Sequence, residues 1–263
     1  MTDAWDPGQY ERFKAERAAP FVDLRGLVEP VPGGRVVDLG CGTGELTATL
    51  AAALGAQKVV GIDSSPAMLA EAAGHAGPGL RFEAGDIGAL DAPAAWDVVF
   101  SNSALQWVPD HRAVLARWAA ALRAGGQLAV QVPANFDHPS HLVAAEVATE
   151  APFVAAFDGS LPPDAGINVL RPEEYAVLLD DLGFARQHVR LQVYGHRLGS
   201  TADVVEWVKG TALTRFKRAL APDVYELLVE RYRRRLLEVL GEHQPYFYPF
   251  KRILLWGSRR AAP

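Results

Sequence analysis

The chain of 263 residues is 49% hydrophobic and 22% charged, and its formal net charge at pH 7 is −5. This hydrophobic content is enough for one large α/β domain with insertions, and the negative charge argues against a general affinity for nucleic acid. A single cysteine excludes an intramolecular disulfide, and the first residues carry neither a basic nor an apolar signal segment. No apolar run is long enough to span a membrane, so we expect a cytoplasmic protein without a membrane partner.

Residues 1–34, which precede the first expected strand, hold aromatic residues with basic residues between them. Two interpretations of this segment stay open. It is an amphipathic N-terminal piece that packs on the domain, or it is a lid over the site that contributes Trp5, Tyr10 or Arg17.

The central pattern of the chain is a strand, a glycine-rich turn, a helix and a second strand. Residues 35–39 form a β-branched run that stops at the glycine-rich residues 40–44, and leucines at four-residue spacing then predict a helix over 46–54. A second strand over 58–62 ends on Asp63. This unit predicts a ligand site at the turn, because glycines let the backbone approach a ligand closely and the helix N-terminus offers unpaired N–H groups.

Two kinds of nucleotide site share this pattern, and Glu45 separates them. The dinucleotide fingerprint G-x-G-x-x-G, counted from Gly40, needs its third glycine at position 45, where a carboxylate would repel a pyrophosphate. The observed D-x-G-C-G-T-G instead resembles the first motif of class I S-adenosylmethionine-dependent methyltransferases, whose ligand carries no phosphate. Asp63 is then expected to accept the ribose hydroxyls, and Asp38 to hold an ammonium group or to order the loop. A loop that binds nothing is the remaining interpretation.

Polar residues follow the next strands at the edge where a doubly wound sheet binds its ligands. A third strand over 80–84 precedes Asp86, which can accept from an adenine amino group, and Ile87, which can pack on the ring. A fourth strand over 96–101 runs directly into a polar and aromatic turn, and Met68 in the preceding helix either touches adenine or is plain core. The predicted cofactor-binding residues are Asp38, Gly40, Cys41, Gly42, Asp63, Ser64, Met68, Asp86, Ile87 and Asn102.

Three further strands, over 128–132, 184–194 and 247–256, are expected to complete one sheet. Two further helices are expected, one from 109 through Leu122 ended by Gly125-Gly126 and one over 172–182. Together they predict a Rossmann-like, seven-stranded doubly wound sheet in a single methyltransferase domain, residues 1–263. Residues 134–170 and 200–245 are interpreted as insertions that form a cap over the active site. His138 and His141 lie three residues apart, but no further ligand accompanies them, so no metal is expected.

Segments at both ends and in both insertions carry a more specific resemblance. They are W-D-P-x-x-Y-x-x-F-x-x-E-R-x-x-P at 5–20, V-D-L-G-C-G-T-G at 37–44, G-I-D-S-S-P-A-M at 61–68, S-N-S-A-L-Q-W-V-P-D-H at 101–111, A-V-Q-V-P at 129–133, N-F-x-x-P-S-H at 135–141, Y-x-H-x-L at 194–198, W-V-K-G-T-A-L at 207–213 and F-Y-P-F-K-R at 247–252. Together they resemble the trans-aconitate methyltransferases. A minor departure is Thr43, where that family often has proline.

The resemblance implies methyl transfer from S-adenosylmethionine to one carboxylate of a small tricarboxylic acid, giving a monomethyl ester. A carboxylate is ionised at neutral pH, so no general base and no catalytic residue are expected, and catalysis is by positioning. The other carboxylates of the substrate need cationic partners, and Arg17 and Arg252 lie in the family-matched segments. The predicted substrate-binding residues are Tyr10, Arg17, Gln106, Trp107, His196 and Arg252.

Three alternatives stay open. A methyltransferase for another small acid or for an acyl-carrier ester would share the cofactor motifs. An adenine amino-methyltransferase would show [DN]-P-P-[YF] after the fourth strand, whereas residues 102–105 read N-S-A-L. A non-catalytic module that binds S-adenosylmethionine would keep the same loop, but it would need no arginine near the methyl group. The sequence does not specify an oligomeric state.

Overall fold

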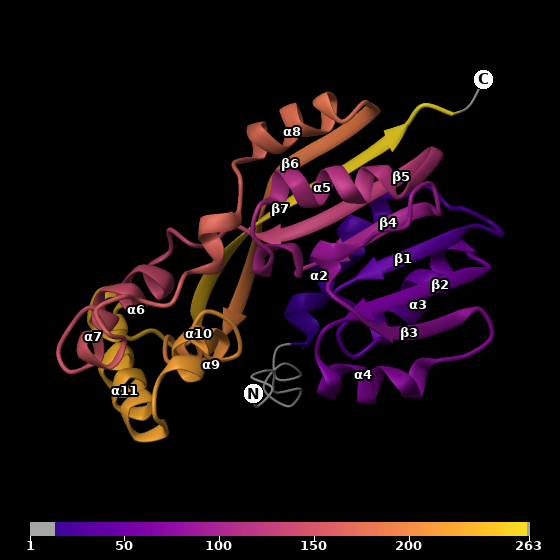
Figure 1. Ribbon diagram of the computed structural model, residues 1–263. Helices are drawn as coiled ribbons and strands as arrows, with labels where there is room; N and C mark the ends of the chain where they lie inside the picture. The colour runs from indigo at the N-terminus through magenta and orange to yellow at the C-terminus, as the bar shows by residue number, and fades with distance from the viewer. Residues whose placement is uncertain (1–13, 262–263) are drawn as a thin grey trace. The chain divides into compact units, whose positions relative to one another are not determined.

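The computed structural model describes residues 14–261, with side chains from residue 18 on. The described chain divides into two compact units, each described here by itself. The sheet unit contains Arg17–Pro133, Asn168–Gln192 and the chain from Arg252 on, and the helical unit contains Ala134–Ile167 and Val193–Lys251. Figure 1 labels the helices and strands along the chain.

One sheet of seven strands has the order β3-β2-β1-β4-β5-β7-β6, which confirms the predicted doubly wound arrangement. Its strands are β1 (Arg35–Leu39), β2 (Lys58–Asp63), β3 (Leu80–Ala84), β4 (Trp96–Asn102), β5 (Leu122–Pro133), β6 (Phe184–Leu198) and β7 (Tyr246–Arg259). The first five strands pair in parallel, and β7 runs antiparallel to β5 (Figure 1). The strand order reverses at β1, which lies between β2 and β4, so ligands are expected beyond the carboxyl ends of β1 and β4.

The helices of the sheet unit are α2 (Lys14–Leu27), α3 (Glu45–Leu54), α4 (Pro66–Ala72), α5 (His111–Ala120) and α8 (Pro172–Asp181). Short 3-10 turns, η1 (Ala73–His75), η2 (Ile87–Ala89) and η3 (Leu105–Trp107), lie between them. The central strands are buried almost continuously, as parallel strands covered on both faces must be. Phe21 and Leu24 of α2 are also core residues, and Phe21 meets Phe100 of β4 edge to face with ring centroids 5.7 Å apart.

One expected boundary is wrong. The helix predicted to continue through Leu122 ends at Ala120, and Leu122 is the first residue of β5, where it pairs with Trp96. Gly125, with a φ of 75°, lies inside this strand and does not end a helix. The outer strands β6 and β7 are likewise longer than expected. Pairing with neighbouring strands supplies backbone hydrogen bonds to polar residues, and single-sequence periodicity does not record these bonds.

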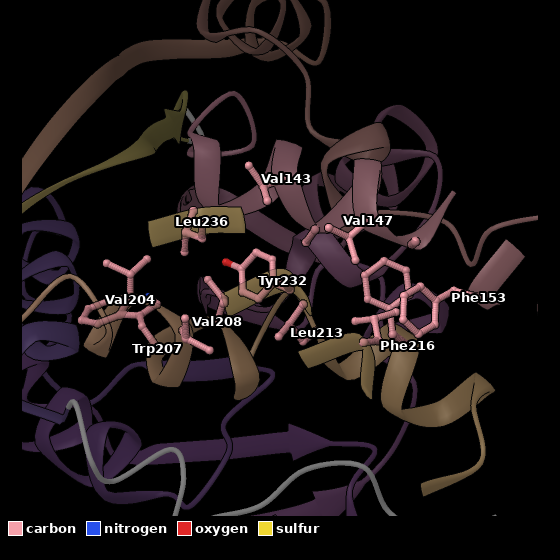
Figure 2. Close-up of a cluster of buried hydrophobic side chains, with 14 of the residues drawn as sticks. Val143, Val147, Phe153, Val204, Trp207, Val208, Leu213, Phe216, Tyr232 and Leu236 are labelled. Atoms are coloured by element: carbon pink, nitrogen blue, oxygen red, sulfur yellow. The ribbon is translucent and has the colours of Figure 1, made fainter. Parts of the chain in front are cut away.

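The helical unit contains α6 (Pro139–Ala148), α7 (Phe153–Ala156), α9 (Asp203–Lys209), α10 (Thr214–Ala219) and α11 (Pro222–Leu240), with η4 (Ala165–Asn168) at its border. Residues of both predicted insertions share one hydrophobic core, drawn in Figure 2. Trp207, Phe216 and Tyr232 of the second insertion are buried in the same core as Val147 and Phe153 of the first. The two insertions therefore fold together. Their role as a cap over the active site stays a prediction.

Among the residues that the structure describes, no helix combines the length and the apolar character needed to cross a membrane.

Candidate functional site

The glycine loop between β1 and α3 adopts a backbone that side chains disfavour. Gly40, Gly42 and Gly44 have φ values of 83°, 55° and 81°. A Cβ atom at Gly40 would lie 2.1 Å from the Cβ of Ala104, so the loop passes directly against the segment that follows β4. The backbone N–H of Gly40 donates to the carbonyl of Ile62 at 2.7 Å, which ties the loop to β2. Only glycine satisfies both the left-handed conformation and the close approach.

The carboxylate of Asp63 braces this loop from the end of β2. Its Oδ2 accepts from the backbone N–H of Gly42 and its Oδ1 from the backbone N–H of Ser65, both at 2.9 Å. Each carboxylate oxygen has more than one lone pair and can accept a further hydrogen bond. Asp63 is therefore held in one orientation while it keeps the capacity to accept two hydroxyl groups, as a ribose partner must.

Asp38 is a buried carboxyl group beneath the loop, with only 4% of its surface exposed. Its Oδ2 accepts from the hydroxyl of Thr47 in α3 at 2.6 Å, so it joins β1 to the helix after the loop. Burial raises the pKa of Asp38 to about 7, the hydroxyl of Thr47 opposes this rise, and the charge of Asp63 adds to it. The observed hydrogen bond supports the expected ordering role. With a pKa near 7 the carboxyl is partly protonated at neutral pH, and a bound cation would shift it to the ionised form.

Cys41 is a small buried loop residue. Burial, followed by the nearby charges of Asp38 and Asp63, raises the pKa of its thiol well above the ordinary range. A thiol that stays protonated is a poor nucleophile, so the side chain of Cys41 contributes packing and is not expected to react covalently.

Four further predicted cofactor contacts lie at or next to the starts of two short helices. Ser64 is exposed, whereas its neighbour Ser65 begins α4 by accepting from the N–H of Met68 at 3.2 Å, and Met68 is buried. Asp86 follows β3 and begins η2, its Oδ1 accepting from the N–H of Gly88 at 2.8 Å. Ile87 in the same turn is half-buried. Asp86 thus stands at the carboxyl end of β3 with an exposed side chain, as an adenine partner requires.

A polar cluster occupies the carboxyl end of β4. Ser103 has a left-handed φ of 59°, and its hydroxyl donates to Oε1 of Gln131 in β5 at 2.7 Å. Gln106 is buried, and its Nε2 donates to the carbonyl of Ser103 at 2.7 Å. Within the described residues, the buried Oδ1 of Asn102 and Oε1 of Gln106 have no hydrogen-bond partner. Buried acceptors of this kind are candidates for donors on a ligand.

Arg252 reaches the same cluster from β7. It is 5% exposed, and its Nη1 donates to Oγ of Ser103 at 2.9 Å and to Oε1 of Gln131 at 3.2 Å. The structure therefore places a predicted substrate arginine beside the end of β4. Ser103 and Gln131 were not among the sequence predictions. The sequence did contain a hint that Gln131 is a functional residue, because it is a lone polar residue in the apolar run A-V-Q-V-P at 129–133.

Comparison with known proteins identifies the family. Residues 36–126 match the family model described as a methyltransferase domain. A trans-aconitate 2-methyltransferase of Deinococcus radiodurans is 43% identical over 257 residues, which cover 97% of this chain and 98% of that protein. The chain belongs to the trans-aconitate 2-methyltransferase family. A second member, from Streptomyces avermitilis, is 36% identical over an alignment of 266 positions, gaps included, which covers 98% of each chain.

Solved structures share the fold of this methyltransferase. The YcgJ protein of Bacillus subtilis has a TM-score of 0.60 at 15% identity, and the superposition covers 93% of this chain and 100% of that one. A geranyl diphosphate methyltransferase in complex with S-adenosylmethionine has a TM-score of 0.53 at 19% identity, covering 92% of this chain and 84% of that one. At these identities the likeness shows the class I methyltransferase fold and nothing finer.

The remaining predicted substrate residues of the methyltransferase are Tyr10, Arg17, Trp107 and His196. Tyr10 lies outside the described residues, and Arg17 is described only as a backbone position of α2. Trp107 is 37% exposed in η3. His196 belongs to the helical unit, where its ring lies 4.9 Å from that of Trp207. In the described part of the chain, no group of three or more His, Cys, Asp or Glu residues is arranged to hold a metal.

Proposed function

We propose that this protein transfers the methyl group of S-adenosylmethionine to one carboxylate of trans-aconitate, producing a monomethyl ester and S-adenosylhomocysteine. The observation that carries the proposal is the 43% identity to a trans-aconitate 2-methyltransferase over 97% of the chain. Both insertions lie within this match. A shared cofactor domain alone would leave them unmatched, and these are the parts of the chain that differ among methyltransferases with a common fold.

The cofactor is assigned to the carboxyl ends of β1 to β4. Asp63, held by the backbone N–H groups of Gly42 and Ser65, accepts the ribose hydroxyls, and Asp86 accepts from the adenine amino group. Asp38 favours a bound ammonium group through its charge. The other residues assigned to this site are Gly40, Cys41, Gly42, Ser64, Met68, Ile87 and Asn102.

The methyl transfer needs no proton shuttle. An ionised carboxylate oxygen attacks the sulfonium methyl group, the carbon–oxygen bond forms as the carbon–sulfur bond breaks, and the bonding electron pair passes to sulfur. The carboxylate is already ionised at neutral pH, so the protein contributes orientation and exclusion of water. We assign Arg252 and Arg17 to the remaining carboxylates, because a guanidinium binds a carboxylate through two parallel hydrogen bonds. Tyr10, Gln106, Trp107 and His196 are secondary candidates.

The proposal is tested by methyl transfer from labelled S-adenosylmethionine to a panel of acceptors: trans-aconitate, cis-aconitate, isocitrate, citrate and a malonyl-carrier ester. The expected result is the highest kcat/KM with trans-aconitate and an ester product. Cofactor binding by calorimetry without turnover of any acid would overturn the proposal and favour a non-catalytic module. Preferred turnover of the carrier ester would favour the alternative acyl-carrier methyltransferase.

A cytoplasmic location and the absence of nucleic-acid partners stay predictions, which are supported by the net charge of −5 and by the single cysteine.

A further inference from the structure

Ser103 has a strained backbone conformation and takes part in four hydrogen bonds. Its left-handed φ of 59° is unusual for a residue with a Cβ atom. Its N–H donates to the carbonyl of Gln131 at 2.9 Å, and its carbonyl accepts from Nε2 of Gln106 at 2.7 Å. Its hydroxyl donates to Oε1 of Gln131 and accepts from Nη1 of Arg252. Such a conformation persists only where the surroundings over-determine it, and residues of this kind concentrate at functional sites.

Gln131 is the residue that ties this cluster together. It lies in β5, opposite Asn102 of β4 and Leu254 of β7, and its side chain is fully buried. One atom, Oε1, accepts from both Ser103 Oγ at 2.7 Å and Arg252 Nη1 at 3.2 Å. Within the described residues, this side chain forms hydrogen bonds only with Ser103 and Arg252. Gln131 therefore acts through the two residues that it holds.

The neutral amide at position 131 has a chemical consequence. A glutamate there would accept the same two hydrogen bonds, but its negative charge would lie about 3 Å from the guanidinium of Arg252. An adjacent carboxylate would neutralise the arginine and repel an anionic ligand, most strongly in a buried environment. Glutamine supplies the acceptor without the charge. The Nε2 of Gln131 is also buried and has no hydrogen-bond partner within the described residues, so only Oε1 of this amide enters the network.

We propose that Gln131 is a positioning residue for substrate binding. Its Oε1 fixes Arg252 and the hydroxyl of Ser103 at the carboxyl end of β4, and its neutrality preserves the attraction of Arg252 for a carboxylate of the substrate. This inference rests on the proposed function, because it takes Arg252 as the anchor of an acidic substrate.

The decisive variant is Gln131→Glu, with Gln127→Glu as its matched control. Gln127 lies four residues earlier in β5, is also buried, and accepts through Oε1 from the backbone N–H of Glu29 at 2.8 Å and from Nε1 of Trp256 at 3.0 Å. It thus shares the strand, the burial and the two accepted hydrogen bonds, but neither of the groups that donate to it is an arginine. Its Nε2 also donates to the carbonyl of Glu29 at 3.0 Å, so Gln127→Glu is the more demanding test of whether the fold tolerates a buried carboxylate. Both variants add a buried carboxylate, so a general effect of burying charge appears in both.

The expected result for Gln131→Glu is a KM for trans-aconitate raised at least about tenfold, the equivalent of one charge-assisted hydrogen bond, with the Kd of S-adenosylmethionine unchanged. Gln127→Glu should leave KM unchanged. An unaltered KM in Gln131→Glu would overturn the inference. Equal losses of substrate and cofactor affinity in both glutamate variants would do the same, since they would indicate a folding defect.

A second variant keeps the test decisive if Gln131→Glu does not fold. Ser103→Gly accepts the left-handed backbone without strain and removes only the hydroxyl between Gln131 and Arg252. It should raise KM with a smaller change in kcat, whereas an unchanged KM would count against the network.

Failure of the inference is separable from failure of the proposed function. The wild-type enzyme is first assayed for turnover of trans-aconitate, which tests the function alone. Binding of trans-aconitate and citrate to the S-adenosylhomocysteine complex is then measured by calorimetry in wild type and Gln131→Glu. Weaker binding in the variant supports the inference even if turnover of trans-aconitate is absent. Equal binding, or no binding of either acid to the wild type, overturns it.

Discussion

The buried carboxyl of Asp38 makes a prediction about stability and pH. Its pKa in the folded protein is raised from 3.8 to about 7, chiefly by burial. As the pH rises above 3.8, Asp38 ionises in the unfolded chain but keeps its proton in the folded one, so the unfolded state is favoured. The destabilisation grows until the pH passes about 7 and is constant above that. A rise from 3.8 to about 7 corresponds to roughly 4 kcal/mol in the free energy of unfolding.

The variant Asp38→Asn removes this cost, because an amide stays neutral and its oxygen can still accept from the hydroxyl of Thr47. We expect the unfolding free energy of the variant to exceed that of the wild type by a margin that grows with pH. Between pH 4 and pH 8 this margin should increase by up to about 4 kcal/mol. Urea unfolding of the cofactor-free proteins at several pH values measures it. All other titrating groups are common to both proteins, so the difference isolates Asp38.

The same variant should bind the cofactor less tightly. If the ammonium group of S-adenosylmethionine pairs with ionised Asp38, the asparagine loses about 1.5 to 3 kcal/mol of binding free energy, as for a charge-assisted hydrogen bond. Binding to the wild type near pH 6.5 should also release protons, which calorimetry in buffers of different ionisation enthalpy detects, and the variant should release fewer. A stability difference that does not depend on pH between 4 and 8 would refute the reasoning about burial.

Three further predictions concern the loop. Asp63→Ala should weaken cofactor binding by about 1 to 3 kcal/mol in calorimetry, because two loop N–H groups and the ribose hydroxyls lose their acceptor, and unchanged affinity would contradict this role. Gly40→Ala should lower the unfolding free energy by at least about 1 to 3 kcal/mol, since its Cβ would meet that of Ala104 at a strained φ. Gly74→Ala, with open space around it, should be nearly neutral in the same melt and serves as the control. Cys41→Ala should retain kcat, because burial keeps the thiol protonated, and loss of turnover with cofactor affinity intact would show a chemical role for sulfur.

Local sequence predicted the strands and the glycine loop that carry the proposed cofactor residues. The β-branched run before Gly40 placed β1, and the acidic residue after the next apolar run placed Asp63 at the end of β2. The same reasoning misplaced the boundary between α5 and β5, because Leu122 is equally compatible with either element and its pairing with Trp96 decides. The substrate residues were predicted by resemblance, and their roles stay predictions.

Sequence alone determined the glycine loop and the positions of its acidic partners Asp38 and Asp63, because all of these residues belong to one βαβ unit. Gly40 and Asp63 are only 23 positions apart, and the glycine conformations and strand ends follow from local sterics. Tertiary structure alone decided that Arg252 meets Ser103, which precedes it by 149 positions. That contact exists because β7 inserts antiparallel beside β5, so that Arg252 enters the sheet opposite Pro133, close to Gln131. Strand partners are chosen by the burial and hydrogen bonding of the whole sheet, and no local pattern encodes that choice.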